Sequence, residues 1–280
     1  MNIREKINFI EDFESDIENI YKKYLIKENL AYKNTQSYFH QYMNFLDRYI
    51  IPKPRKVLES SNLKISNNVK TQGYEKLKEK ISKGEDINQY QSKKLDESFY
   101  IDELFNFEGL VHLHLGDSIE HKKSRNRNYI DRTENLAIAM ITDARAYILS
   151  IEPHGKNTWV NEKYLQILRH EFPELFKEQT IGKLSVNDIE KCHKLGISYS
   201  KVPMIIGTKI RAKNIVIKDK LNDYISIKGK EIKEDIKKRE KNGNFEIRLK
   251  EMISEKNGYP KEMIFEIFKN KKPYGEYEIK

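Results

Sequence analysis

The chain has 280 residues and a net charge of +9, with 52 Lys and Arg against 43 Asp and Glu, seven histidines and one cysteine. A hydrophobic content of 38% supports a packed core and excludes a disordered chain. The best apolar run, 136–142, is far shorter than the ~18 residues of a membrane span. The lone Cys192 excludes an internal disulfide, and the N-terminus lacks a signal-peptide core, so we expect a cytoplasmic protein.

The positive charge is concentrated in two places. Residues 208–280 hold 20 basic and 13 acidic side chains, and the short stretch 121–132 holds five Lys and Arg and one Asp. Such a balance favours a polyanionic partner, nucleic acid first, although a Lys-rich surface can also be merely solvated. The cluster at 121–132 is the sharper indication because it joins two predicted strands.

The N-terminal part, residues 1–82, is predicted to be helical. Apolar side chains recur three and four residues apart between Ile3 and Leu25 and again over 37–50, and a short helix is expected over 74–82. The polar stretch 85–98 is interpreted as a linker to the next part.

The central part, residues 83–178, is predicted to form a twisted antiparallel sheet with a following helix. Three strands are expected at 110–115, 136–141 and 146–151, connected by one long basic loop and one tight turn. The helix begins at Asn161.

The C-terminal part, residues 179–280, is predicted to be a basic α+β module, so the chain as a whole belongs to the α+β class. The strands expected here are 202–206, 214–218, 224–227 and 245–249, and the helices are 229–240 and 259–268.

Three histidines belong to the predicted central sheet. Residues two apart in a strand share a face, so His112 and His114 point the same way, whereas the apolar residues between them point to the core. Since two imidazoles cannot be buried cheaply without partners, we expect them to line an open surface or a cleft. His154, at the end of the third strand, lies within reach.

This histidine cluster fits metal-independent RNA cleavage. One of His112 and His114 would act as base and His154 as acid, because imidazole exchanges protons near neutral pH. Arg132, just before the second strand, would stabilise the charged phosphorane. Trp159 would stack a base if exposed, or anchor the following helix if buried. The residues expected to bind nucleic acid are Lys122, Lys123, Arg125, Arg127, Lys156 and Trp159.

Two other interpretations stay open. The same three histidines, completed by Glu120 or Asp117, could form the metal centre of a hydrolase or oxygenase. The neighbouring basic loop disfavours a dication, so neither a metal nor another cofactor is expected. Alternatively, the protein is a non-catalytic nucleic-acid-binding module.

The order of motifs, LVHLHLG…NLAIAMITDARAYILSIEPHG, resembles the catalytic sheet of RelE-type toxin endoribonucleases over about 50 residues. The resemblance implies an mRNA-cleaving toxin, with His112, His114, Arg132 and His154 at the matching positions, and an antitoxin or other regulatory partner. The chain departs from that family in its long 117–132 loop and its large terminal additions.

A wider string is similar to an uncharacterised set of bacterial proteins. It comprises PKPRKV, KGEDINQYQS, DELFNFEGLVHLHLG, ENLAIAMI and PHGKNTW, within residues 52–175. This similarity implies no activity, but it places the centre of the protein at 109–160. We therefore expect a bacterial toxin-like or phage-defence endoribonuclease whose partner is RNA and not a membrane.

Overall fold

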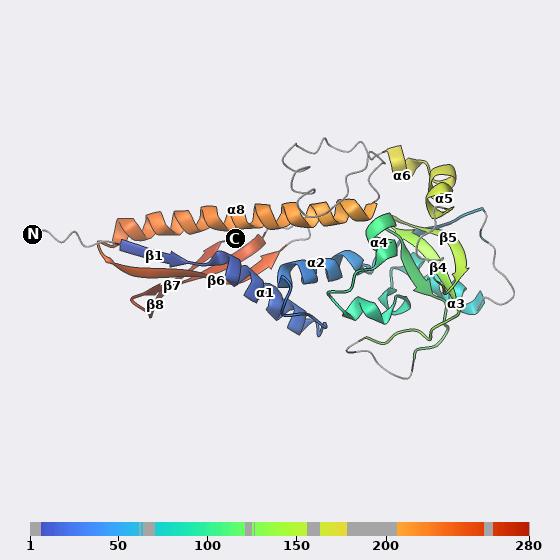
Figure 1. Ribbon diagram of the computed structural model, residues 1–280, viewed down its shortest axis with the longest axis horizontal. Helices are drawn as coiled ribbons and strands as arrows, with labels where there is room; N and C mark the ends of the chain where they lie inside the picture. Colours follow the sequence, from blue (N-terminus) through green and yellow to red (C-terminus); the bar gives the residue numbers. More distant parts are fainter. Residues whose placement is uncertain are drawn as a thin grey trace, which may run out of the picture. The chain divides into compact units, whose positions relative to one another are not determined.

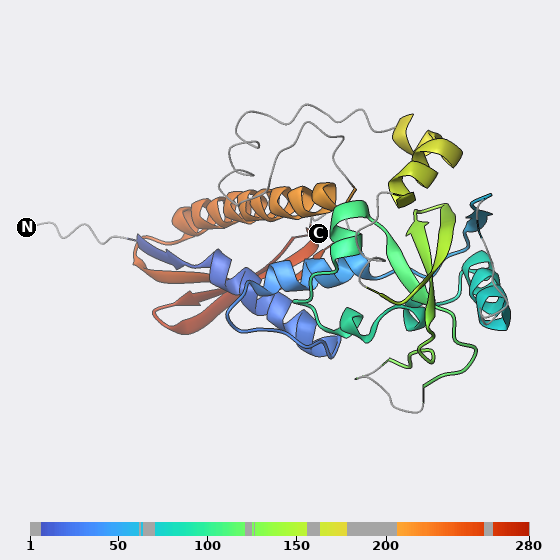
Figure 2. The same ribbon diagram turned by 45° about the vertical axis from the view of Figure 1, so that its right-hand side comes forward.

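The computed structural model shows an α+β protein, as the sequence predicts (Figures 1 and 2). The chain forms two compact units: a terminal unit, made of 1–43 and 213–280, and a central unit, 44–212. The expected parts 1–82, 83–178 and 179–280 do not coincide with these units, because the two ends of the chain pair with each other. The structure describes residues 7–61, 63, 71–120, 125, 127–155, 163–177, 206–254 and 260–279.

The terminal unit is a four-stranded sheet packed against helices, with α8 running along the sheet (Figure 1). The strand order is β1-β6-β7-β8; β1 pairs parallel to β6, and the other pairs are antiparallel. Its elements are β1 (Ile7–Glu11), α1 (Phe13–Lys27), α8 (Ile206–Arg239), β6 (Gly243–Ser254), β7 (Pro260–Lys269) and β8 (Lys272–Ile279).

The predicted N-terminal helix is wrong in its first turns, where β1 forms instead. This strand depends on a partner more than 230 residues away, since Ile7 lies opposite Gly243. Asp12 then separates strand from helix, because its side chain accepts a hydrogen bond from the Ser15 backbone N–H at 3.1 Å and caps α1.

Several C-terminal predictions are also wrong. The expected strands 214–218 and 224–227 lie inside α8, and the expected helix 259–268 is mostly strand β7, where buried side chains alternate. Residues 202–205 of another expected strand lie outside the described residues. Five buried side chains of α8 repeat at helical spacing: Ile217, Leu221, Ile225, Ile232 and Ile236. Despite its 34 residues α8 is too polar to cross a membrane, and no other helix in the described ranges is suited to do so.

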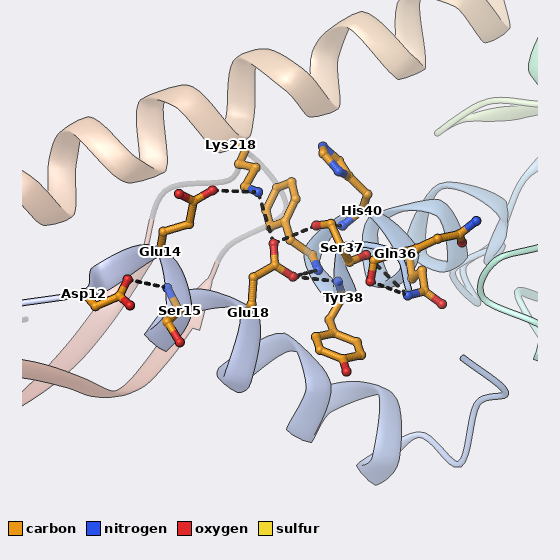
Figure 3. A network of polar contacts seen from close by, with 11 residues as sticks. Asp12, Glu14, Ser15, Glu18, Gln36, Ser37, Tyr38, His40 and Lys218 are labelled. Carbon is orange, nitrogen blue, oxygen red and sulfur yellow. Dashed lines mark hydrogen bonds and ion pairs between the residues drawn. The ribbon is translucent and has the colours of Figure 1, made fainter. Parts of the chain in front are cut away.

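Glu18 joins three helices of the terminal unit (Figure 3). Its carboxylate accepts hydrogen bonds from the Ser37 hydroxyl at 2.7 Å and from the Tyr38 backbone N–H at 2.6 Å, where α2 (Tyr38–Arg48) begins. Lys218 of α8 donates at 3.0 Å. Burial raises the pKa of Glu18, but the hydrogen bonds from Ser37, Lys218 and the Phe39 backbone N–H, with the charge of Lys218, outweigh it and hold the pKa below its usual value.

The central unit contains the second sheet, with strand order β2-β5-β4-β3. The antiparallel pairs β3·β4 and β4·β5 confirm the predicted three-stranded meander. The sheet is nevertheless mixed rather than antiparallel, because β2 pairs parallel to β5 at one edge. The elements are β2 (Lys56–Glu59), α3 (Thr71–Lys83), α4 (Glu103–Glu108), β3 (Val111–His114), β4 (Asn135–Ile141), β5 (Arg145–Pro153), α5 (Lys163–Glu171) and α6 (Glu174–Lys177).

The segment 85–98, interpreted as a linker, is instead a folded part of the central unit. It forms two short 3-10 helices, Asn88–Tyr90 and Lys93–Asp96. Its apolar residues are buried, and the fully buried Asn88 exchanges hydrogen bonds of 2.8 and 2.7 Å with the backbone of Ile50. These contacts fix the course of the chain toward the candidate site.

Candidate active site

Strand β3 presents its two histidines to one face of the sheet and its leucine to the other. Leu113 belongs to the core on one face, whereas His112 and His114 share the other face with a second apolar cluster that includes Ile138 and Tyr164. His112 is 9% exposed and His114 is 2% exposed. The expectation that both imidazoles line an open surface is therefore wrong for His114, because helices α4 and α5 cover this face.

The structure brings the three histidines of the sequence prediction together. The ring centroids of His112 and His114 are 6.2 Å apart, with the rings edge-on, and those of His114 and His154 are 6.3 Å apart, nearly parallel. The backbone N–H of His154 donates to the Glu134 carbonyl at 2.6 Å, which holds the end of β5 beside the start of β4. His154 itself is exposed.

Two of the histidines line an open pocket of about 410 Å³. The sequence predicted that His112 and His114 line an open surface or a cleft; in the structure His112 and His154 line the pocket, whereas His114 is buried and is not part of its lining. The volume is within the range of small-ligand sites. The remaining lining residues are Ser92, Tyr100, Ile101, Asp102, Glu103 and Leu104.

Asp102 connects the pocket wall to His112. One carboxylate oxygen accepts from the Phe105 backbone N–H at 3.1 Å and caps α4, and Oδ2 lies 3.8 Å from Nδ1 of His112. Sequence reasoning missed this residue. The signal was present, because an aspartate directly before an apolar helical run is a typical N-cap.

Burial and neighbouring charges keep the two strand histidines neutral. Burial lowers the pKa of His112, and His154 and Arg132 lower it further, against the opposing charge of Asp102. Burial, then the charges of His112, Arg132 and His154, lower the pKa of His114 to about 3. A neutral imidazole at the pocket can accept a proton, as a general base must.

The loop between β3 and β4 is structured where its two ends join the sheet. Its two arms pair through Ile119 and Ile130, and a side chain at Gly116 would come within 2.3 Å of the Asp131 carbonyl oxygen. Only glycine allows this approach, which sets Arg132 beside the histidines. Arg132 is exposed, and its charge acts on both His112 and His114.

The basic residues of this loop differ in their contacts and exposure. Arg127 was expected to bind nucleic acid, but its guanidinium pairs with buried Asp96 and lies 5.1 Å from the Phe45 ring centre. It therefore serves the core of the central unit, since desolvated aspartate needs a counter-charge. Arg125 is exposed near the tip. The other predicted nucleic-acid contacts, Lys122, Lys123, Lys156 and Trp159, lie outside the described residues.

The alternative metal centre had two candidate fourth ligands, Glu120 and Asp117. Glu120 forms an ion pair with Lys93. In the part of the chain that the structure describes, no group of three or more His, Cys, Asp or Glu side chains is arranged to hold a metal ion.

Sequence reasoning also missed a buried acid on the same face. Glu108, the last residue of α4, is only 7% exposed, and burial raises its pKa to about 7. Its charge affects Tyr164 of α5, which places it toward that helix. A single glutamate before a glycine gives no sequence signal of burial.

Comparisons with known proteins identify no relative. No family model, no curated protein and no solved structure matches the chain.

Proposed function

We propose that the protein is a metal-independent endoribonuclease of the bacterial toxin or phage-defence kind, acting in the cytoplasm. The observation that supports it is one pocket lined by two histidines, His112 and His154, with an arginine beside them. RNA cleavage by its own 2′-hydroxyl needs a base, an acid and a cation: the two histidines line the pocket, and Arg132 acts on His112 from outside the lining. A toxic activity would also require a neutralising partner or a trigger.

In the proposed reaction, His112 is the base. Asp102 favours a proton on Nδ1 and leaves Nε2 to take the proton of the 2′-hydroxyl. The 2′-oxygen forms a bond to phosphorus while the bond from phosphorus to the 5′-oxygen breaks, and His154 gives its proton to that leaving oxygen. Arg132 neutralises the phosphorane. The products are a 2′,3′-cyclic phosphate and a 5′-hydroxyl.

His114 is assigned a supporting role in this scheme, unlike in the sequence prediction. It is too buried to reach RNA, and its ring lies nearly parallel to that of His154. We propose that His114 positions His154 rather than exchanging protons with substrate.

Histidine variants test this function directly. His112→Ala and His154→Ala should each lower cleavage of cellular RNA by roughly 10²-fold or more in EDTA, and abolish growth arrest on expression. The exposed His40 and His170 lie outside the pocket, so His40→Ala and His170→Ala are matched controls that should keep full activity. Wild-type protein that cleaves no RNA, or equal activity in all four variants, would contradict the proposal.

A further inference from the structure

Besides the histidines and polar groups, the pocket has aromatic and apolar lining residues. Tyr100, Ile101 and Leu104 all line it, and Ile101 is 56% exposed. The phosphate chemistry assigned to His112 and His154 has no use for apolar side chains. A flat, hydrophobic ligand group such as a nucleobase would pack against these apolar side chains.

Tyr100 is held firmly in this lining. The guanidinium of buried Arg48 lies 5.8 Å from its ring centre and donates to the carbonyls of Lys94 and Glu97 at 3.0 and 2.9 Å. The Asn44 side-chain amide donates to the Tyr100 carbonyl at 2.9 Å. The ring is therefore preorganised, which reduces the entropy lost when a ligand stacks on it.

Glu103 adds a carboxylate to the same lining. Its side chain is exposed, and within the described ranges it forms no hydrogen bond or ion pair, in contrast to Asp102. Charges of both signs lie close to Tyr100. Burial, then the charge of Asp102 and more weakly that of Glu103, raise the pKa of the tyrosine hydroxyl, whereas Arg48 and Lys94 lower it. The carboxylate of Glu103 thus offers acceptor oxygens beside the Tyr100 ring, which suits the donor edge of a nucleobase.

We propose that Tyr100 and Glu103 form a nucleobase subsite that selects guanine next to the scissile phosphate. This inference rests on the proposed ribonuclease function. Guanine stacks on the tyrosine and presents two adjacent donors, N1–H and N2–H, to the two oxygens of the carboxylate. Adenine and cytosine present one amino donor beside a ring-nitrogen acceptor that the carboxylate repels, and uracil presents one donor between two carbonyls.

The test uses four oligodeoxynucleotides that differ only in one ribonucleotide, G, A, C or U, so that cleavage can occur at one position only. The wild-type full chain should cleave the G substrate roughly tenfold to a hundredfold faster than the others, in kcat/KM. Glu103→Gln should remove this preference and still cleave the other three. Glu79→Gln, at an exposed position on α3, is the matched control and should keep it.

The results that would overturn the nucleobase subsite differ from those that would overturn the ribonuclease function. Equal cleavage of all four substrates by wild type, or an unchanged G preference in Glu103→Gln, overturns the subsite and leaves the ribonuclease in place. If nothing is cleaved, calorimetry with guanosine and uridine 3′-monophosphates decides: guanosine binding that Glu103→Gln abolishes supports the subsite, and equal binding of both nucleotides overturns it.

Discussion

At the scale of single residues, the pair of His112 and Asp102 sets the chemistry of the pocket. Asp102 favours the charged imidazole and so opposes the effect of burial on the pKa of His112. Asp102→Asn keeps a good helix cap but removes the charge. We expect the pKa of His112 to fall, so the acidic limb of the kcat/KM profile should move to lower pH, with a loss of rate of roughly tenfold or more. An unchanged pH profile would exclude Asp102 as the partner of the base.

Glu108 should give the stability of the protein an unusual pH dependence. Its folded-state pKa of about 7 lies above the ordinary value, so its favourable contribution is complete below pH 4.5 and is lost as the pH rises through 7. Glu108→Gln should therefore raise the free energy of unfolding at pH 8 by about 1–3 kcal/mol and change it little at pH 4, measured by urea denaturation.

Glu18 serves as the control of opposite sign. Its pKa is lowered, so its contribution is present above pH 4.5 and is lost as the pH falls through the folded-state value. Glu18→Gln should lower the free energy of unfolding at pH 7 by about 1–2 kcal/mol. If both variants change the free energy of unfolding in the same direction at pH 8, the assignment of Glu108 as a buried carboxyl group with a raised pKa is wrong.

At the scale of elements, the turn at Gly116 determines where the 117–131 loop leaves the sheet. A methyl group there meets the Asp131 backbone oxygen at 2.3 Å, and backbone cannot move aside cheaply. Gly116→Ala should cost about 1–3 kcal/mol of stability. It should also displace Arg132 and lower kcat, while His112 keeps its pKa shift from burial. If Gly116→Ala is destabilised but has a normal kcat, Arg132 takes no part in catalysis.

The elements that the sequence predicts well are those with a local signal. Strands β3, β4 and β5 follow one another closely, and each is short, apolar and bounded by turn residues. In α8 the β-branched residues suggested strands, although the burial of Ile217, Leu221 and Ile225 has helical spacing. Strand β1 could not be predicted locally because its partner is β6.

The candidate site likewise has a part that the sequence predicts and a part that it does not. The spacing of His112, His114 and His154 predicted a cluster, since alternation along strands is a local rule. The contribution of 100–104 to the pocket could not be predicted, because contacts from Asn44 and Arg48, which are distant in sequence, hold Tyr100. The burial of His114 likewise depends on helices that approach from elsewhere in the chain.

At the scale of the whole molecule, the two units have separate hydrophobic cores. Phe265 is fully buried in the terminal unit, so Phe265→Ala should cost about 3–5 kcal/mol. We expect calorimetry to show one unfolding transition moving to lower temperature while a second stays in place. RNA cleavage should persist below the first transition. A single transition that shifts as a whole would mean that the two cores unfold together.

The central claim is that this site cleaves RNA through the 2′-hydroxyl with His112, His154 and Arg132 and without a metal ion. Its most direct test is mass spectrometry of the RNA ends produced by the full-length protein in EDTA. The account predicts 2′,3′-cyclic phosphate and 5′-hydroxyl ends, and no cut where the scissile nucleotide is 2′-deoxy. Ends carrying 3′-hydroxyl and 5′-phosphate, or cleavage at the deoxy position, would contradict it.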